Sequence, residues 1–379
     1  MSSGRRNFIK KTVLASLASA AFPTILSAGY PANEKLVVGL TGADSQGFKN
    51  LKYFLNQLNI ECGAIYDSDK NMLEKIAAET EKIQGKKPLI YNDFRRLAEN
   101  NDVDLVINSI PGDVGPLISA CESGKDIYTT APLVISEQDF CTITALQKSN
   151  GNIIETDRWS YRHPVLQKII RHMRSEKFGI IKNVHVWNYT NYQNTGTNSF
   201  NKLNTNQSAD LFTRQSMQEL HKAISLIPGK EPHSLFSTGA NYQSSLKTEE
   251  TPDTVMSIFD FGEFELLWDR SAFIHFSRYR RNKGVAFKST KGILLIDDDN
   301  WQWNSYSDKS RQDVICEIQN FDKNGNHLHV MGFIDNVKTR QSSDISLKTA
   351  ALISKANNLA QLACLRKKKL LWGRCLLDR

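Results

Sequence analysis

The stretch from residue 35 to residue 67 constrains the fold of this chain more than any other. A short apolar strand over 35–40 leads into a loop that carries Gly42 and Gly47, and a helix is expected over 48–58. A second strand, 61–66, ends at Asp67, which follows Gly47 by about 20 residues. This order of strand, glycine loop, helix, strand and acid is typical of the first half of a dinucleotide-binding domain.

Helices and strands alternate through the rest of the first half. The expected strands are 88–91, 104–108, 126–129 and 152–155, and the expected helices are 71–80, 94–100, 114–123 and 137–150. Such alternation predicts an α/β domain with a doubly wound parallel sheet of the Rossmann type. We assign this domain to residues 35–157, after a linker at 29–34.

The pattern becomes strand-rich from about residue 158. After one helix, 164–176, the expected strands are 181–189, 255–259, 263–269, 286–289 and 292–296, and two helices follow at 329–339 and 346–366. The sequence therefore predicts a second α/β domain over 158–373, with a large open, mostly antiparallel sheet. A short tail remains at 374–379.

The net charge of +8 does not indicate a nucleic-acid partner, because the excess lies at the two ends of the chain. Four cations and no acid lie in residues 1–28, and six cations with one acid lie in residues 366–379. The nearly neutral body has no basic stripe with interleaved aromatic residues. No apolar run reaches the roughly 18–20 residues of a membrane span, so we expect no stable membrane insertion. The six cysteines form no CxxC pair, so we expect no metal site.

Residues 1–28 have the features of an export signal. Arg5 and Arg6 precede an apolar stretch over 12–21, which is followed by Ser27 and Ala28. A basic start, a short apolar middle and a small-residue end are typical of a secretory signal, and paired arginines are typical of the twin-arginine type. We therefore expect a periplasmic protein that is exported already folded.

The glycine loop indicates a nicotinamide dinucleotide as cofactor. Gly42 is expected to supply the tight turn, and Gly47 the close packing of helix on strand. The Asp67 carboxylate would accept hydrogen bonds from ribose hydroxyls, which favours NAD over NADP. Asp44, however, stands where the fingerprint has its middle glycine. An inward carboxylate would oppose a phosphate by roughly 4 kcal/mol at 4 Å with an effective dielectric of about 20. The residues alone leave nucleotide binding open.

Motifs along the chain resemble those of the Gfo/Idh/MocA family, which includes glucose–fructose oxidoreductase and inositol dehydrogenase. Residues 101–111 (NDVDLVINSIP) resemble the family's "DVDAVIIATP" strand, and residues 126–133 (DIYTTAPL) take the place of its "V-Y-C-E-K-P-L" turn. Further similar segments are 178–182 to "LGKIK", 251–254 to "TPDT", 329–335 to "HVxNFID" and 366–373 to the closing "GRKLKWD". The resemblance runs from about residue 35 to residue 373.

The resemblance implies a Rossmann domain and a second domain whose sheet makes oligomer contacts, so we expect a homo-oligomer. It also implies a nicotinamide cofactor, NAD or NADP, and a sugar- or cyclitol-like ligand. Pro111 and Pro132 fall at cofactor-binding positions of the family. A periplasmic enzyme that loads a nucleotide in the cytoplasm would have a reason to be exported folded.

The chain departs from the family's catalytic positions. Catalytic members carry a lysine beside nicotinamide and a helix with a histidine and an aspartate. Here Ala131 replaces the lysine, Gln218 the histidine and His221 the aspartate, and Gly115 falls where many members have another histidine. The loss of a positioned acid–base group typically lowers the rate by about 10²–10⁴, so activity by the family's usual mechanism would be nearly lost.

Three remaining residues are candidates for contact with the ligand. His221 can act as a lone base, or it can be a polar helix residue bonded to Gln218. Arg158 can bind a carboxylate or sugar oxygen, and Trp159 can stack on a sugar face. Alternatively, Arg158 forms a salt bridge at the hinge between the domains, over a half-buried Trp159.

Two charged segments are expected to have structural roles. Arg278, Arg280 and Arg281 flank Tyr279. They can be cleft or interface cations, but a solvated basic turn is favoured. The acidic run 297–299 lacks the spacing of a calcium loop, and it predicts a turn between strands.

Three hypotheses for function remain. The leading one is an oxidoreductase-like protein that binds a nicotinamide dinucleotide and a sugar- or cyclitol-like ligand, with weak, altered or absent activity. The second is a non-catalytic periplasmic binding or scaffold protein, which Ala131 and Gln218 favour. The third is an NAD-assisted glycoside-cleaving enzyme, which is known among relatives of the family.

Overall fold

The chain divides into two compact units. The computed structural model describes residues 35–110, 113–130, 136–156, 164–190, 216–227, 229–240, 242, 252–272, 274, 276–306, 313–320, 325–341 and 345–373. Unit 1 comprises Met1–Arg158 with Asn326–Leu347, and unit 2 comprises Trp159–Gly325 with Lys348–Arg379.

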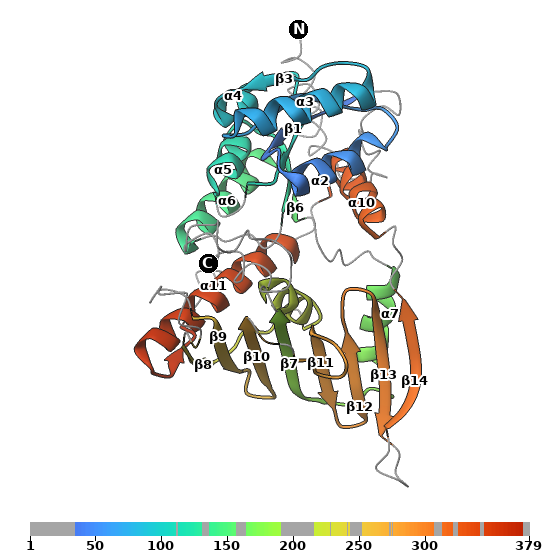
Figure 1. The fold of residues 1–379 in the computed structure, drawn as a ribbon, viewed down its shortest axis with the longest axis vertical. Coiled ribbons are helices and arrows are strands. Elements are labelled where there is room, and N and C mark those ends of the chain that lie inside the picture. Colours follow the sequence, from blue (N-terminus) through green and yellow to red (C-terminus); the bar gives the residue numbers. More distant parts are fainter. Residues whose placement is uncertain are drawn as a thin grey trace, which may run out of the picture. The chain divides into compact units, whose positions relative to one another are not determined.

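Unit 1 contains a six-stranded parallel sheet in the order β3-β2-β1-β4-β5-β6 (Figure 1). The strands are β1 (Leu36–Thr41), β2 (Ile60–Tyr66), β3 (Leu89–Tyr91), β4 (Leu105–Asn108), β5 (Asp126–Thr129) and β6 (Ile154–Thr156). β1 and β4 are almost fully buried and consist mainly of apolar residues, as expected for central strands covered on both faces. The strand order reverses between β1 and β4, which confirms the doubly wound sheet.

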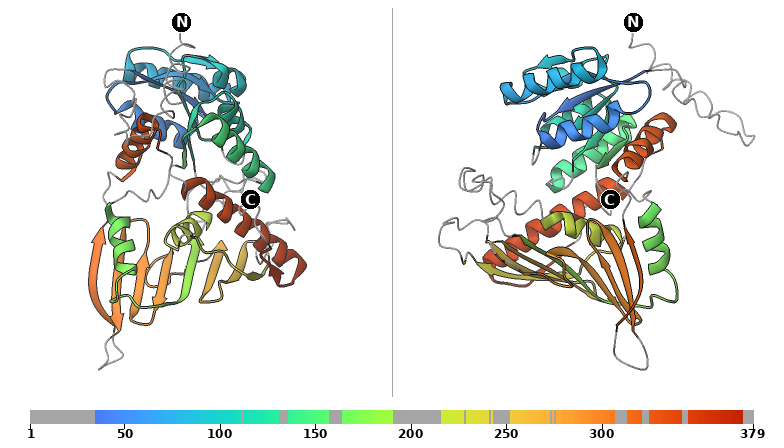
Figure 2. Two further views of the ribbon diagram at one scale, coloured as in Figure 1. Left: turned by 180° about the vertical axis from the view of Figure 1, so that it is seen from behind. Right: turned by 45° about the vertical axis from the view of Figure 1, so that its right-hand side comes forward.

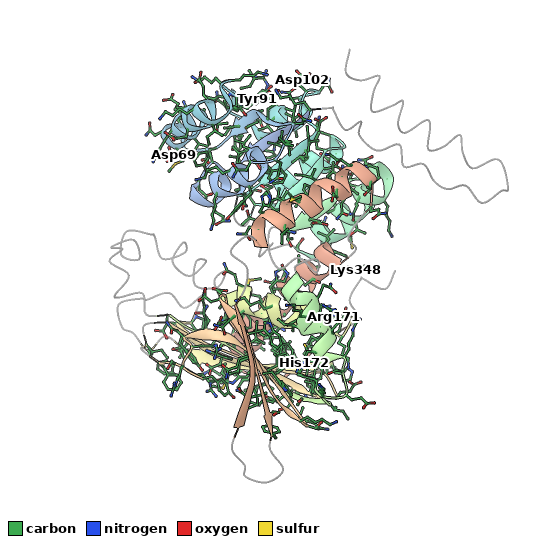
Figure 3. All side chains as sticks on the ribbon, turned by 90° about the vertical axis from the view of Figure 1, so that its right-hand side faces the viewer. Asp69, Tyr91, Asp102, Arg171, His172 and Lys348 are labelled. Carbon is green, nitrogen blue, oxygen red and sulfur yellow. The ribbon has the colours of Figure 1, made fainter. Side chains whose placement is uncertain are left out.

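Five helices connect these strands, and four begin at a side-chain cap. They are α2 (Ser45–Leu55), α3 (Lys70–Gln84), α4 (Phe94–Glu99), α5 (Gly115–Glu122) and α6 (Glu137–Asn150). Asp44, Asp69, Asp93 and Ser136 cap α2, α3, α4 and α6 by accepting backbone N–H groups of the first turn. Asp69 and Tyr91 are labelled in Figure 3. A cap of this kind is worth about 1 kcal/mol, so each helix start is specified locally.

A sixth helix of unit 1, α10 (Gly325–Thr339), comes from late in the chain. The sequence analysis predicted that this segment belongs to the second domain, 158–373. In the structure, Phe333 of α10 joins the core beside Phe54 of α2, with ring centroids 6.1 Å apart. Asn336 donates to Glu155 Oε1 at 2.5 Å, and His329 Nε2 lies 2.6 Å from the Thr156 carbonyl oxygen. These contacts fix α10 on β6.

Unit 2 contains a nine-stranded sheet in the order β14-β13-β12-β11-β7-β10-β9-β8-β15. Among the described strands of this sheet, only β7 and β10 pair in parallel; the other pairs are antiparallel, which confirms the mostly antiparallel second sheet. The strands are β7 (Ile181–Thr190), β8 (Ser234–Ala240), β9 (Thr254–Asp260), β10 (Glu265–Ala272), β11 (Lys283–Ser289), β12 (Gly292–Ile296), β13 (Asn300–Tyr306), β14 (Asp313–Asn320) and β15 (Leu370–Leu371).

Helices lie against this sheet. They are α7 (Pro164–Met173), a helix over 216–225 and α11 (Ile345–Arg366), and Figure 2 shows the last two on one face of the sheet. His172 of α7, labelled in Figure 3 beside Arg171, packs on Trp303 with ring centroids 4.6 Å apart. Burial of these aromatic surfaces fixes α7 against β13.

Candidate functional site

The glycine loop of unit 1 needs glycine at both predicted positions. Gly42 has a φ of +85° and donates its N–H to the Tyr66 carbonyl at 3.0 Å, which closes the turn after β1. A Cβ at Gly42 would lie 2.7 Å from the Ser109 carbonyl carbon, and one at Gly47 would lie 1.9 Å from the Gly42 oxygen. Both contacts are with backbone, so a side chain would force the loop apart. The geometry of the loop therefore requires glycine at both positions, and their role in cofactor binding stays a prediction.

Asp44 occupies the N-terminus of α2 with its own carboxylate. Asp44 Oδ1 accepts the N–H of Gly47 at 2.7 Å, and its carbonyl accepts the N–H of Phe48. The first turn of a helix offers N–H groups and a positive dipole end that favour anions. Here the chain supplies that anion itself. Sequence reasoning considered the charge of Asp44 but not its capping role.

Asp67 lies at the end of β2 and contacts the same loop. Asp67 Oδ2 accepts the N–H of Ala43 at 2.6 Å, and Oδ1 accepts the N–H of Asp69 at 2.8 Å. A carboxylate has about four acceptor positions, so two oxygens with one bond each keep capacity for further donors. The carboxylate is thus oriented by the backbone and can still accept hydroxyl groups.

A neutral hydrogen-bond network follows the carboxyl ends of the central strands. Asn108 Nδ2 donates to Thr129 Oγ1 at 3.3 Å. Thr130 Oγ1 accepts from Asn50 of α2 at 3.1 Å and lies 3.0 Å from the Ser109 hydroxyl. Thr130 stands where the resemblance expects the glutamate of the family's E-K-P turn. Hydroxyl and amide groups, rather than charges, therefore join α2 to β4 and β5 at this edge.

Several predicted site residues lie outside the described residues. These are Pro111, Pro132, Arg158 and Trp159, together with Ala131 at the position of the family lysine. Gly115 is described, and it is the first residue of α5. The signal proposed for residues 1–28 also lies outside the described part of the chain.

The two remaining candidates, Gln218 and His221, lie on the helix over 216–225 in unit 2. Gln218 is half-buried, and His221 is buried with 5 % of its surface exposed. The same helix carries a second pair with the same spacing of three residues, Glu219 and Lys222. Their side chains are 0 % and 1 % exposed, and Lys222 Nζ donates to Glu219 Oε2 at 2.8 Å.

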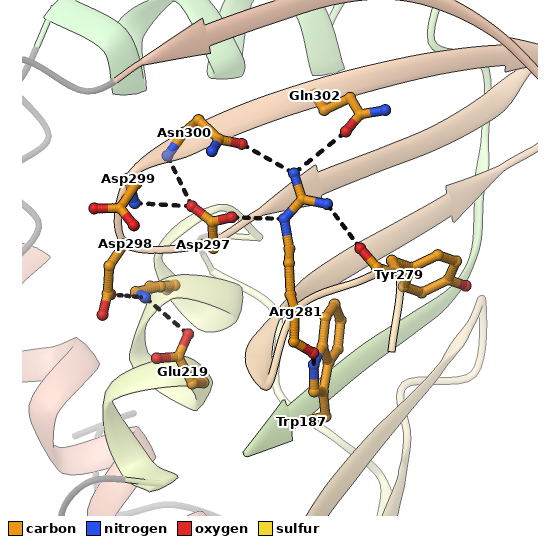
Figure 4. Close-up of polar contacts among 10 residues, drawn as sticks. Trp187, Glu219, Tyr279, Arg281, Asp297, Asp298, Asp299, Asn300 and Gln302 are labelled. Atoms are coloured by element: carbon orange, nitrogen blue, oxygen red, sulfur yellow. Dashed lines mark hydrogen bonds and ion pairs between the residues drawn. The ribbon is translucent and has the colours of Figure 1, made fainter. Parts of the chain in front are cut away.

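Sequence reasoning missed this pair. The only local signal was a Glu-x-x-Lys spacing, which on most helices is a solvent-exposed pair. Lys222 also donates to Asp298 in the turn between β12 and β13; Glu219 and Asp298 are labelled in Figure 4. Lys283 Nζ lies 2.5 Å from Asp298 Oδ2. The four side chains form a network that we call the Glu219–Lys283 charge cluster.

The pKa values of the two carboxyl groups in this cluster are shifted in opposite directions. Burial raises the pKa of Glu219 above its ordinary value; the charge of Lys222 opposes this effect and that of Asp298 adds to it. Burial alone would also raise the pKa of Asp298, but Lys222 and Lys283 hold it well below its usual range. The nearby carboxylates keep the pKa of Lys222 high despite its burial. Asp298 is therefore the firmly ionised partner of Lys222, and Glu219 is the carboxyl that protonates more readily.

The acidic run 297–299 forms the predicted turn, but the expected solvated basic turn is wrong for Arg281. Arg281 Nε donates to Asp297 at 2.6 Å, and its Nη2 donates to Asn300 and Gln302 (Figure 4). Its side chain is only 15 % exposed. The pairing of β11 with β12 brings these residues together, which local sequence does not reveal.

Among the described residues, no group of three or more His, Cys, Asp or Glu side chains is placed to hold a metal ion. Within the same ranges, no helix is both long and apolar enough to cross a bilayer. Cys62 and Cys121 are free and buried, and burial raises the pKa of each thiol to about 12, so neither is a nucleophile.

Comparison with solved structures identifies the fold. A levoglucosan dehydrogenase in complex with NADH superimposes with a TM-score of 0.72 over 90 % of this chain and 100 % of that chain, at 13 % identity. Myo-inositol 2-dehydrogenase from Lactobacillus plantarum gives 0.69 over 89 % and 99 %, at 14 % identity. The chain has the two-domain fold of Gfo/Idh/MocA-type oxidoreductases, which confirms the resemblance seen in its motifs.

Curated proteins add a more specific likeness. An α-N-acetylgalactosaminidase of Shewanella oneidensis is 27 % identical over 156 residues, which are 39 % of this chain and 34 % of that protein. A glycosyl hydrolase family 109 protein of Shewanella baltica is 24 % identical over 200 residues, 46 % and 43 % of the two chains. The match thus spans less than half of these relatives, which are of the same Gfo/Idh/MocA type. No family model matches the chain.

Proposed function

We propose that the protein binds a nicotinamide dinucleotide, NAD or NADP, and a sugar- or cyclitol-like ligand, with hydride-transfer activity that is weak or altered. The observation that carries this proposal is the Asp67 carboxylate, which the Ala43 N–H holds against the glycine loop at the carboxyl edge of the sheet. Ligands of doubly wound sheets bind at this edge, beside the point where the strand order reverses. NAD is favoured, because a carboxylate would repel a 2′-phosphate.

The residues of unit 1 fit a dinucleotide in two respects and oppose it in one. The tight turn at Gly42 matches the first glycine of the fingerprint, and Asp67 keeps acceptor positions for ribose hydroxyls. Asp44 opposes the phosphates, because its carboxylate already accepts an N–H at the start of α2. We therefore expect weak rather than absent binding, with Asp44 as its main limit.

When bound, the nicotinamide ring would exchange a hydride with a carbinol carbon of the ligand. The chain must then remove the hydroxyl proton, which needs a positioned base. Thr130 of the neutral network cannot perform this step at neutral pH, because its hydroxyl is not basic. The altered chemistry follows from these uncharged groups in place of the family's acid–base residues.

Native followed by denaturing mass spectrometry tests this proposal. We expect the protein purified from its exporting host to release a nucleotide on denaturation, or to bind NAD⁺ in millimolar solution. An Asp67→Ala variant should lose that binding. A chain that stays empty in millimolar NAD⁺ and NADP⁺ would reject the proposal in favour of a non-catalytic binding protein.

A glycoside-cleaving activity assisted by NAD is a second candidate, and the likeness to an α-N-acetylgalactosaminidase favours it. Hydrolysis of p-nitrophenyl α-N-acetylgalactosaminide tests it directly. We expect release of nitrophenol that depends on NAD⁺ if this candidate holds, and none if the oxidoreductase proposal alone is right.

We also propose that the protein is exported to the periplasm and forms a homo-oligomer through the second sheet. Phe236, Met256 and Ile258 support the second point, because they are 42 %, 43 % and 40 % exposed on paired strands, with Phe236 directly opposite Ile258. Contiguous exposed apolar surface is typical of interfaces. Cell fractionation tests the location. Light scattering of wild-type and Phe236→Glu protein tests the assembly, which the charge should weaken.

A further inference from the structure

The end of α11 and the residues that follow it present exposed cations between exposed apolar side chains. Arg366 ends α11, residues 367–369 are all lysines, and the four cations are exposed. Leu365, directly before them, is 61 % exposed, and Leu371, two residues after the last lysine, is 79 % exposed. We call residues 365–371 the C-terminal basic segment. It belongs entirely to unit 2.

The backbone of the C-terminal basic segment is held in one conformation. Lys367, at a φ of +52°, and Lys368 donate their N–H groups to carbonyl oxygens of the last turn of α11, each at 3.3 Å. β15 then pairs with β8, and the Trp372 indole N–H donates to Glu231 Oε2 at 2.8 Å. Figure 1 shows this red end of α11 beside β8. A fixed backbone loses less conformational entropy on binding than a free tail would.

Little negative charge offsets the four cations. Lys369 Nζ lies 4.0 Å from Asp260 Oδ2, and the two side chains are 64 % and 45 % exposed. An ion pair with this exposure contributes little free energy. Within the part of the chain that the structure describes, no carboxylate forms an ion pair with Arg366, Lys367 or Lys368. The segment therefore keeps a positive charge that is available to an anionic partner.

Two structural roles explain part of this pattern. Cations in the last turn of a helix complement its dipole, which accounts for Arg366. Lysine beside an edge strand discourages pairing with another sheet, which accounts for Lys369 next to β15. Neither role explains Lys367 and Lys368 together with an exposed leucine on each side. An acidic polymer would attract the cations but would leave both leucines in water. An anionic lipid surface attracts cations and also accepts apolar side chains.

We propose that the C-terminal basic segment is a docking surface for anionic phospholipids, through which the protein binds a membrane surface reversibly. The four cations contact lipid phosphate groups, and Leu365 and Leu371 enter the apolar boundary below the headgroups. The attraction between exposed charges is screened by salt, so the binding is salt-dependent. This inference does not rest on a nucleotide cofactor, and it concerns a surface of unit 2 alone.

Co-sedimentation with lipid vesicles tests the proposal. The full-length protein is mixed with phosphatidylcholine vesicles that contain either roughly one-third phosphatidylglycerol or none. Lys367→Asn combined with Lys368→Gln removes two charges, and asparagine tolerates the positive φ at position 367. Leu371→Gln removes one apolar side chain and keeps every charge. The matched control, Arg95→Gln with Arg96→Gln, removes two adjacent exposed cations of α4 in unit 1.

We expect wild type to bind the phosphatidylglycerol vesicles and not the pure phosphatidylcholine vesicles. Each cation near an anionic surface strengthens binding about fivefold, so the double lysine variant should bind about 10- to 30-fold more weakly. Leu371→Gln should weaken binding about 10-fold. The double arginine control should stay within about threefold of wild type. All variants share residues 1–28, so differences between them do not come from the basic start of the chain.

Three results would overturn the proposal. The first is a failure of wild type to bind phosphatidylglycerol vesicles. The second is equal binding by wild type and the double lysine variant, with both melting temperatures the same. The third is that poly-glutamate binds wild type and Leu371→Gln equally and displaces the vesicles, which would assign the segment to an acidic polymer. None of these measurements involves NAD⁺, so they are independent of the outcome for the proposed function.

Discussion

Replacement of Asp44 by serine separates the two roles of this side chain. Serine caps a helix about as well as aspartate, so Asp44→Ser keeps an acceptor for the Gly47 N–H and removes only the charge. Asp44→Ala removes both. The cap is worth about 1 kcal/mol, which corresponds to a loss of about 2–4 °C in the melting temperature of a unit of this size.

The effect on nucleotide affinity has an upper limit set by electrostatics. A phosphate charge 4 Å from the carboxylate is repelled by about 4 kcal/mol at an effective dielectric of about 20, or roughly 10³ in affinity. Asp44 is only half-buried, and water and salt screen such a charge. We therefore expect Asp44→Ser to bind NAD⁺ about 10- to 100-fold more tightly than wild type.

Calorimetric titration with NAD⁺ and with adenosine measures this effect. Adenosine has no phosphate, so its affinity should not change, and the gain for NAD⁺ should shrink at high salt. Asp93→Ser is the matched control, because Asp93 caps α4 in the same way by accepting the Arg95 N–H. An equal affinity of Asp44→Ser and wild type for NAD⁺, or an equal gain in Asp93→Ser, would refute the reasoning.

Three further predictions concern stability and are read by denaturation. Gly47→Ala places a Cβ 1.9 Å from the Gly42 oxygen, so we expect a loss of at least about 1–3 kcal/mol, and an unchanged urea midpoint would contradict the loop geometry. Arg281→Met removes the charged donor to Asp297 Oδ2, while Oδ1 keeps its two backbone donors, and should cost about 1–3 kcal/mol, whereas Arg281→Lys should recover only part. The pKa of Glu219 is raised in the folded state, so Glu219 ionises in the unfolded chain first as pH rises. The contribution of Glu219 to the stability of the folded state therefore falls between its unfolded pKa and its folded pKa. The melting temperature of Glu219→Gln relative to wild type should therefore increase with pH, and a flat difference would argue against a raised pKa.

The first sheet was predictable from sequence because its signals are local. The central strands are short, mainly apolar runs, and four of the five connecting helices begin at a capping residue next to their first turn. The strand expected at 104–108 is β4 at Leu105–Asn108, for example. Gly42 and Gly47 likewise identify the loop, because a tight turn and a close backbone contact exclude a side chain.

The strands of the second sheet were harder to predict. The sequence analysis gave no bounds for β8, β13 or β14, and β13 shows why. Trp301 and Trp303 are buried on one face, while Gln302 between them bonds to Arg281. Polar residues at alternate positions weaken the apolar signal, and the strand is stabilised mainly by its neighbours, which are distant in sequence.

The sequence by itself determined the class of fold, the glycine loop with Asp67, and the unusual acid at position 44. Only the tertiary structure decided what Asp44 binds, and which charges on the helix over 216–225 are buried. Lys222 meets Asp298 across 76 positions of the chain, and that contact depends on strand pairing rather than on local preference. Because burial and long-range ion pairing set the proton affinity of Glu219, its chemistry is a property of the folded molecule.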